Sequence, residues 1–76
     1  MVTLADFKKN ETGIVVSVVA EGELKRRLLA MGIIKGTEFK IVRRAPLGDP
    51  IEICIKGFKL MLRKNEAQLI TAKKAS

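Results

Sequence analysis

The amino-acid sequence predicts a mainly β protein: a small, partly open β-barrel of about five strands with one short inserted α-helix. Apolar and polar residues alternate with the period of a β-strand through most of the chain after residue 37. Glycine or proline separates these runs, and only residues 23–31 have a helical period. The 76 residues can build one small core. We therefore expect a single domain over residues 1–76, with its core at about 3–72 and a basic, frayed tail at 73–76.

The N-terminal third is predicted to hold a capped turn and a strand. Thr3 can cap a short turn over residues 4–7. Residues 14–19 are β-branched almost throughout and end at a glutamate and a glycine, which is typical of a strand. Ser17 indicates which side faces the core, namely that of Ile14, Val16 and Val18. The opposite side is also apolar, so both faces are expected to be covered.

Residues 23–31 are predicted to form the helix. Its apolar residues recur at i, i+4 and i+7, at Leu24, Leu28 and Met31. Gly32 suits the position just after the helix, where a left-handed conformation ends it. Residues 34–37 suit a type II turn with glycine at its third position.

The second half of the chain is predicted to contribute the remaining strands. The inward-facing positions are expected to be Phe39, Ile41, Ile51, Ile53, Ile55, Leu60 and Leu62. Lys56 and Gly57 form a two-residue hairpin connection, and residues 67–71 can supply a last short strand.

The segment with the most distinctive composition is the loop at residues 43–50, which contains two arginines, two prolines and a glycine. Each proline restricts its own backbone and that of the preceding residue, so the shape of the loop is largely preset. If Leu47 lies at the tip, an apolar side chain faces water, at a cost that a partner surface could recover. The loop is therefore either a surface that binds a partner or a purely structural hairpin connection.

Charge is distributed unevenly along the chain. Residues 1–24 carry two lysines against four carboxylates, a net charge of −2, and since the whole chain has +7, residues 25–76 carry +9. This asymmetry is compatible with an acidic protein surface, phosphate or an anionic membrane face as partner. A solvated basic exterior without a partner is the alternative.

Several absences argue against catalysis and metal binding. The chain has no histidine, and Cys54 is its only cysteine, so it cannot form an internal disulfide or a thiolate cage. Asp49 and Glu52 are close in sequence but are better explained as a turn residue and an outward strand residue than as an acid–base pair. We therefore predict no enzyme activity, no metal site and no cofactor. No apolar run is long enough to span a bilayer, and the N-terminus does not resemble a signal peptide. A reducing, cytoplasmic location is expected.

Nucleic-acid binding is the principal alternative, because small barrels with basic faces commonly bind it. Single-strand binders stack bases on exposed aromatic rings. This chain has no tryptophan or tyrosine, and its small core can use its three phenylalanines, Phe7, Phe39 and Phe58. Nucleic acid is therefore not the expected partner, and recognition of a protein is favoured.

Several segments in order resemble the FeoA family, which comprises small cytosolic accessory proteins of bacterial ferrous-iron uptake. They are residues 24–33, 36–37, 43–51, 57–58 and 60–63, and the resemblance extends over about residues 3–72. It implies an SH3-like barrel and a protein that is not itself an enzyme. It also implies a partner, the iron permease FeoB, a membrane protein with a cytosolic GTP-binding domain.

The resemblance makes the helix and the loop the candidate partner-binding segments. Contact is expected through the cytosolic GTP-binding domain of the permease or the cytosolic face of its membrane part. The candidate contact residues are Arg26, Arg27, Arg43, Arg44, Pro46, Leu47 and Asp49.

Overall fold

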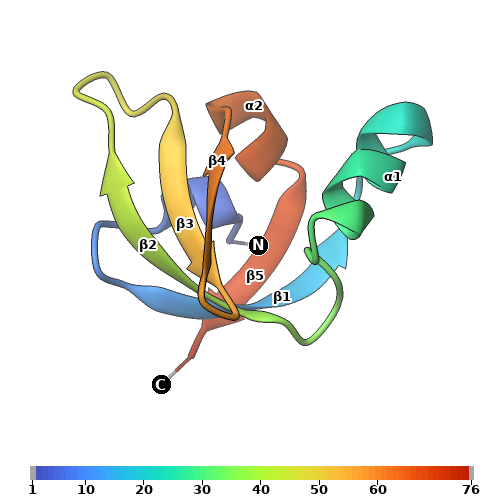
Figure 1. Ribbon diagram of the computed structural model, residues 1–76, viewed down its shortest axis with the longest axis horizontal. Helices are drawn as coiled ribbons and strands as arrows, with labels where there is room; N and C mark the ends of the chain where they lie inside the picture. The colour runs from blue at the N-terminus through green and yellow to red at the C-terminus, as the bar shows by residue number, and fades with distance from the viewer. Residues whose placement is uncertain (1, 76) are drawn as a thin grey trace.

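The computed structural model describes residues 2–75, so Met1 and Ser76, the last residue of the predicted tail, lie outside the described residues. A 3₁₀ turn and two short helices accompany the strands (Figure 1). The elements are η1 (Leu4–Asp6), β1 (Thr12–Val18), α1 (Gly22–Ala30), β2 (Glu38–Arg44), β3 (Ile51–Ile55), β4 (Phe58–Leu62), α2 (Lys64–Ala67) and β5 (Ile70–Lys74).

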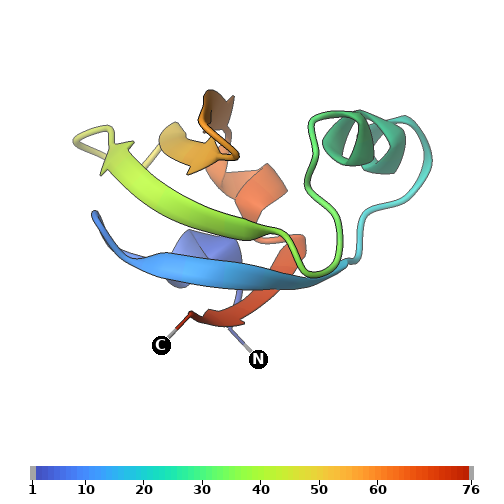
Figure 2. The same cartoon turned by 60° about the horizontal axis from the view of Figure 1, so that its bottom comes forward.

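The five strands form one antiparallel sheet in the order β4-β3-β2-β1-β5. The sheet is strongly curved, as Figures 1 and 2 show, and α2 lies where the chain passes from one edge strand, β4, to the other, β5. Helix α1 lies to one side, beyond the end of β1 (Figure 2). The predicted mainly β fold of about five strands with an inserted helix is confirmed.

The core lies inside the curve of the sheet and agrees with the predicted alternation in β2 and β3. Its fully buried large side chains are Leu4, Phe7, Val15, Leu28, Ile33, Phe39, Ile41, Ile51, Ile53, Leu62 and Ile70. Phe7 and Phe39 meet edge to face, with ring centroids 5.1 Å apart. This arrangement contributes about 0.5–1.5 kcal/mol beyond the area that the rings bury.

The predicted facing of the first strand is wrong at Ile14 and Val16 and correct at Val18. Gly13 and Val15 face the core, whereas Ile14 and Val16 are only partly buried on the opposite side. The pairing of β1 with β5 shifts register between Val15 and Ser17. Such a bulge reverses the facing of the residues that follow it, which allows Val18 to pack against the core as well. The partial burial of Ile14 and Val16 agrees with the expectation that both faces are covered.

The end of α1 and the turn that follows are as predicted. Gly32 has φ +91°. The N–H of Ile33 donates to the Leu28 carbonyl at 3.1 Å, and that of Gly32 donates to Leu29 at 3.0 Å, which is the Schellman arrangement. Thr37 N–H donates to the Ile34 carbonyl at 3.0 Å and closes the next turn.

The connection between β3 and β4 is also as predicted. Lys56 and Gly57 have φ of +50° and +86°. Two positive φ values in a two-residue connection correspond to a type I′ turn.

The C-terminal region differs from the prediction. Residues 64–67 form α2, which was not predicted, and the last strand starts at Ile70 and continues to Lys74. Lys73 and Lys74 therefore belong to the sheet and not to a frayed tail. The Lys74 ammonium lies 2.7 Å from a carboxylate oxygen of Glu11 and 4.2 Å from the ring centroid of Phe7. The strand thus ends on a cation that holds it to the N-terminal segment.

We predict that Gly13→Ala is strongly destabilising. An added Cβ would lie 2.5 Å from Phe7 and 2.7 Å from Phe39, closer than side-chain contacts allow. Overpacking of this kind costs about 1–3 kcal/mol, which thermal or urea unfolding would measure. Lys40→Ala, at an exposed position of the adjacent strand, is the control and should change stability little. Adding Phe7→Leu to Gly13→Ala should recover part of the loss, and strictly additive losses would contradict the steric explanation.

We predict that stability declines in acid through two carboxyl groups. Hydrogen bonds from Thr3, the backbone N–H first, hold the pKa of Asp6 below its usual 3.8. The hydrogen bond from the Lys74 side chain, followed by that from the Lys8 backbone, holds the pKa of Glu11 below its usual 4.5. A depressed folded-state pKa stabilises above the unfolded pKa and is lost as pH falls through the folded value. The melting temperature should therefore be constant from about pH 7 to 5 and fall below about pH 4. Asp6→Asn and Glu11→Gln should each reduce that fall in calorimetric scans.

Candidate protein-docking surface

The loop between β2 and β3, residues 45–50, is held by its own backbone. Ala45 N–H donates to the Pro50 carbonyl at 3.1 Å, and Gly48 N–H donates to the Ala45 carbonyl at 2.7 Å. The second bond closes a turn with Pro46 at its second position, and the Asp49–Pro50 peptide is cis. Leu47 is consequently at the tip and 92% exposed. The tip position that we considered for Leu47 from the sequence is thus the one that it occupies.

Arg44 anchors the base of this loop to the N-terminal turn. One guanidinium nitrogen donates to the carbonyl oxygens of Ala5, at 2.8 Å, and Phe7, at 2.6 Å. The side chain is partly buried. Two charge-assisted hydrogen bonds to backbone carbonyls indicate that this guanidinium positions the loop.

Asp49 joins the far end of the loop to α2. Its Oδ1 accepts a hydrogen bond from the Lys64 N–H at 3.0 Å, at the first turn of this short helix. Carboxylates are favourable there because the first N–H groups of a helix have no partner within it. The N-cap residue is Arg63 and not a serine, threonine, asparagine or aspartate, and the helix has only four residues. The sequence therefore gives little sign of α2, which explains why it was not predicted.

Arg43 extends from the sheet beside the loop and forms an ion pair. Its Nε lies 2.7 Å from Glu52 Oε1, and the arginine side chain is largely exposed. A shallow hollow of about 300 Å³ lies next to it. The hollow is lined by Arg43, Arg44, Ala45, Pro46, Pro50, Glu52 and Met61.

The two helix arginines are placed differently from one another. Arg26 pairs with Glu23 on the exposed side of α1. Arg27 pairs with Glu66 of α2 and so connects the two helices. Arg27 and Pro50 line one hollow, so this arginine borders the loop. Arg26 does not line that hollow, but it lines another with Glu23, Leu24 and Arg27.

The seven predicted contact residues thus have different environments. Pro46, Leu47 and Arg43 present exposed atoms at or beside the tip, whereas Arg44 and Asp49 make hydrogen bonds within the protein. We use the name loop surface for residues 43–50 together with Met61, which is 55% exposed and lines the same hollow. Sequence reasoning left Met61 out. Its signal was available, since it is an apolar residue at an outward position of an alternating strand.

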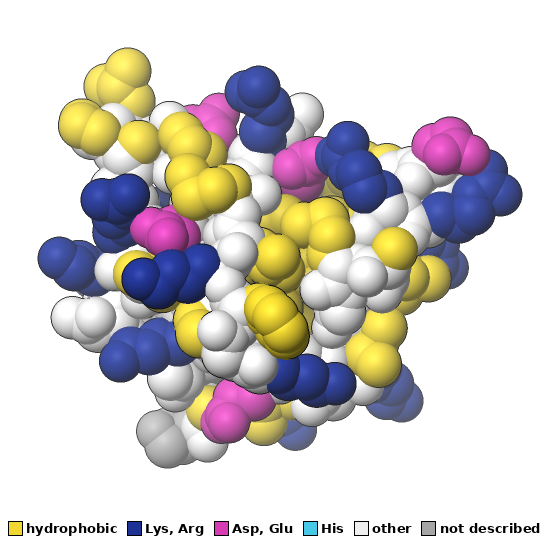
Figure 3. All heavy atoms as spheres, viewed as in Figure 1, with side chains coloured by type: hydrophobic (Ala, Val, Ile, Leu, Met, Phe, Trp, Pro, Cys, Tyr) yellow, Lys and Arg dark blue, Asp and Glu magenta, His cyan; other side chains and the backbone are white. Residues whose placement is uncertain are grey.

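Hydrophobic side chains continue from the loop down over β4, with lysine and arginine side chains around them (Figure 3). Phe58, the first residue of β4, is 72% exposed. The expectation that the core uses all three phenylalanines is therefore wrong for Phe58, although Phe7 and Phe39 are buried. One exposed ring does not form the row of stacking platforms found in single-strand binders.

Residues 2–75 contain no cluster of three or more histidine, cysteine, aspartate or glutamate side chains that could hold a metal ion. Within the same residues, no helix is long and apolar enough to cross a membrane.

Comparison with known proteins gives a consistent result. The FeoA domain family matches residues 2–74. A putative Fe(2+) transport protein A of Campylobacter jejuni is 32% identical over 68 residues, which are 90% of this chain and 92% of that protein. An Fe(2+) transport protein A/Fe(2+) transporter FeoB fusion protein of Porphyromonas gingivalis is 30% identical over 67 residues. The match covers 88% of this chain but 8% of the fusion protein.

Solved structures show the same fold. FeoA of Chlorobium tepidum is 40% identical and superposes with a TM-score of 0.92, covering 99% of this chain and 71% of that one. The zinc complex of Stenotrophomonas maltophilia FeoA, described as a prokaryotic SH3 domain protein, is 27% identical with a TM-score of 0.85. It covers 96% of this chain and 91% of that one. The predicted SH3-like fold and the predicted family resemblance are confirmed.

We predict that the adjacent residues Arg43 and Arg44 differ sharply when truncated. Arg44→Ala should cost about 1–3 kcal/mol of folding stability, because the carbonyls of Ala5 and Phe7 lose a charged donor. Arg43→Ala removes an exposed ion pair and should cost under about 1 kcal/mol. Urea unfolding of the two variants measures the difference. Equal losses would contradict the anchoring role of Arg44.

Proposed function

The chain belongs to the FeoA family, and on this premise we propose that it is a cytoplasmic adaptor that docks on the cytosolic part of a FeoB-type ferrous-iron permease. FeoA is associated with ferrous-iron transport, and it is not a known enzyme family. A relative in which transport protein A and FeoB are one polypeptide supports an association with the FeoB system. We further propose that this chain has no catalytic activity of its own and acts by binding.

The observation that carries the docking proposal is the apolar tip of the loop. Leu47 is 92% exposed, yet the loop that holds it is fixed by a turn at its tip and by Arg44 at its base. A segment already held in one conformation loses little entropy on binding. A side chain that fills a well-packed pocket near the centre of an interface can supply a large share of the binding energy.

The charge of the protein supports a partner with an acidic face. Net charge is +7, and Arg43 lies beside the loop tip. Electrostatic complementarity mainly raises the rate of association and is screened by salt. We therefore assign affinity to the apolar tip and steering to the basic surroundings.

The test is a binding titration against the purified cytosolic GTP-binding domain of the FeoB permease from the same organism. The domain is loaded in turn with GDP and with a non-hydrolysable GTP analogue, and duplex and single-stranded DNA serve as controls. Saturable binding that weakens from about 50 to 500 mM salt is expected. Binding to DNA alone would overturn the proposal. If no binding is seen in any of these titrations, the GTP-binding domain is not the docking site. The full-length permease in detergent is then the next partner to test.

We predict that Leu47→Ala weakens this binding about tenfold or more while the melting temperature stays within a degree or two. The reason is that Leu47 contributes nothing to the buried core. Ile34→Ala is the matched control, because Ile34 is a partly exposed apolar residue in the turn after α1. A large loss of stability in Leu47→Ala, or equal weakening by both variants, would contradict the role of the loop tip.

A further inference from the structure

The two edge strands of the sheet, β4 and β5, differ in whether another segment covers their outer edge. The outer edge of β5 is covered by the N-terminal segment, because Ala72 N–H donates to the Val2 carbonyl at 3.0 Å and Thr3 bridges to Thr71. The outer edge of β4 has no backbone hydrogen bond to another segment within residues 2–75. An unpaired edge is a template for another strand, and proteins usually cover or blunt it.

The geometry of the β3–β4 hairpin determines which backbone N–H and C=O groups of β4 have no partner in β3. The two-residue turn at residues 56–57 brings Ile55 opposite Phe58 as the closing hydrogen-bonded pair. Hydrogen-bonded and non-hydrogen-bonded pairs then alternate along the two strands. The pairs that contain Lys59 and Met61 are accordingly non-hydrogen-bonded. The N–H and C=O groups of these two residues point away from β3 toward the open edge.

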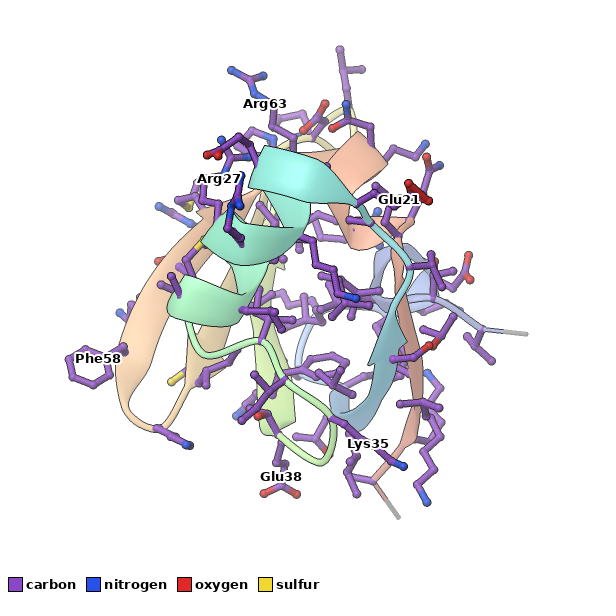
Figure 4. All side chains as sticks on the ribbon, turned by 90° about the vertical axis from the view of Figure 1, so that its right-hand side faces the viewer. Glu21, Arg27, Lys35, Glu38, Phe58 and Arg63 are labelled. Atoms are coloured by element: carbon purple, nitrogen blue, oxygen red, sulfur yellow. The ribbon has the colours of Figure 1, made fainter. Side chains whose placement is uncertain are left out.

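Two hollows lie between β4 and the helices. Figure 4 shows β4 on one side of α1, with Phe58 pointing outward from its start, and with Arg27 and Arg63 together toward the other end. One hollow, of about 360 Å³, is lined by Ala30, Met31, Gly32, Ile55, Lys56, Phe58, Lys59 and Leu60. The other, of about 440 Å³, is lined by Arg27, Pro50, Met61, Leu62, Arg63 and Glu66. Together they border β4 along its length.

The core-facing side chains of β4, which we call its inner row, become more exposed from Leu62 toward the hairpin turn. Leu62 is 1% exposed, Leu60 is half-buried and Phe58 is 72% exposed. These three side chains lie on the same face of the strand, which is the face that forms the core at its other end. An additional strand beside β4 would place its own inward side chains next to Phe58 and Leu60 and cover them.

We propose that the open edge of β4 binds an extended peptide segment of another protein, which adds a strand to the sheet between β4 and α1. The peptide has apolar side chains at alternate positions, because these meet the uncovered inner row. Its intervening side chains are acidic, because Lys56, Lys59 and Arg63 lie along this strand and have no side-chain ion pair within residues 2–75. Backbone bonds supply affinity and the side-chain alternation supplies selectivity.

This site adjoins the loop surface at Pro50 and Met61 but does not include its tip at Leu47. Phe58 lies at the start of β4, whereas the loop surface adjoins the strand at Met61. The peptide test uses no permease, so its failure leaves the adaptor proposal standing and failure of the adaptor proposal leaves this one standing.

The probe is a synthetic peptide of about eight residues that alternates valine and glutamate, with both ends capped. Titration up to about 1 mM into the isotopically labelled protein is followed by amide NMR signals. Saturable shifts of residues 58–62 are expected, with slowed hydrogen exchange at Lys59 and Met61. Two twins of the peptide carry backbone N-methyl groups, one on every valine and the other on every glutamate. Since only alternate N–H groups of a strand face a given neighbour, one twin should lose binding and the other should retain it.

The protein variants separate the groove from the rest of the surface. Phe58→Ala should weaken binding about tenfold without a change in melting temperature, because the ring is mostly exposed in the free protein. Val19→Ala, at another exposed apolar position outside β4, should leave binding unchanged. Equal binding of both N-methylated twins, shifts confined to residues 43–50, or no saturation would overturn the proposal. So would a dimer in solution with these amides already protected, because a second copy would then occupy the edge.

Discussion

The packing of the Phe7 ring against Gly13 and Phe39 places the N-terminal turn on the sheet, and the loop surface depends on that placement. With Phe7 fixed, its carbonyl and that of Ala5 face the Arg44 guanidinium, which donates a hydrogen bond to each. Arg44 then fixes the end of β2 from which the loop departs. An aromatic contact in the core thereby orients an exposed side chain at the far end of a loop.

Helix α2 has a comparable role on the other side of the loop. Four residues form too short a helix to be stable alone. Asp49 satisfies an N–H at its start, and Glu66 accepts the Arg63 N–H at 2.9 Å while pairing with Arg27. These polar contacts tie the loop, α2 and α1 together. They also explain why charged residues that resemble a partner-binding patch in the sequence are partly engaged within the fold.

The features predicted correctly from the sequence are those with local causes. The alternation at Phe39 and Ile41, the cap at Gly32 and the Lys56–Gly57 turn are each determined by a few neighbouring residues. The facing of β1 is not local, because the bulge arises from its pairing with β5 and because Gly13 has no side chain to reveal a core position.

The candidate site could be predicted only in part for the same reason. The prolines and glycine around Leu47 singled out this loop, and the turn closed by the Gly48 N–H places Leu47 at its exposed tip. The role of Arg44 was not predicted, because its partners are backbone carbonyls that leave no mark on a sequence. Phe58 was assigned to the core because a small core can use every aromatic ring. Its position at the start of an edge strand instead leaves it exposed.

The cover over β5 has a consequence for how this domain can be tethered. Val2 bonds to Ala72, and Ala75 bonds to Thr12, so both ends of the described chain leave from the β5–β1 side of the sheet (Figure 2). The loop tip and the edge of β4 lie away from that side. A second polypeptide joined to either end would be held close to this protein, while the loop tip and the edge of β4 stay accessible to it. Covalent linkage would then replace a bimolecular encounter by an effective concentration set by the linker, so even weak contacts at these surfaces would be occupied.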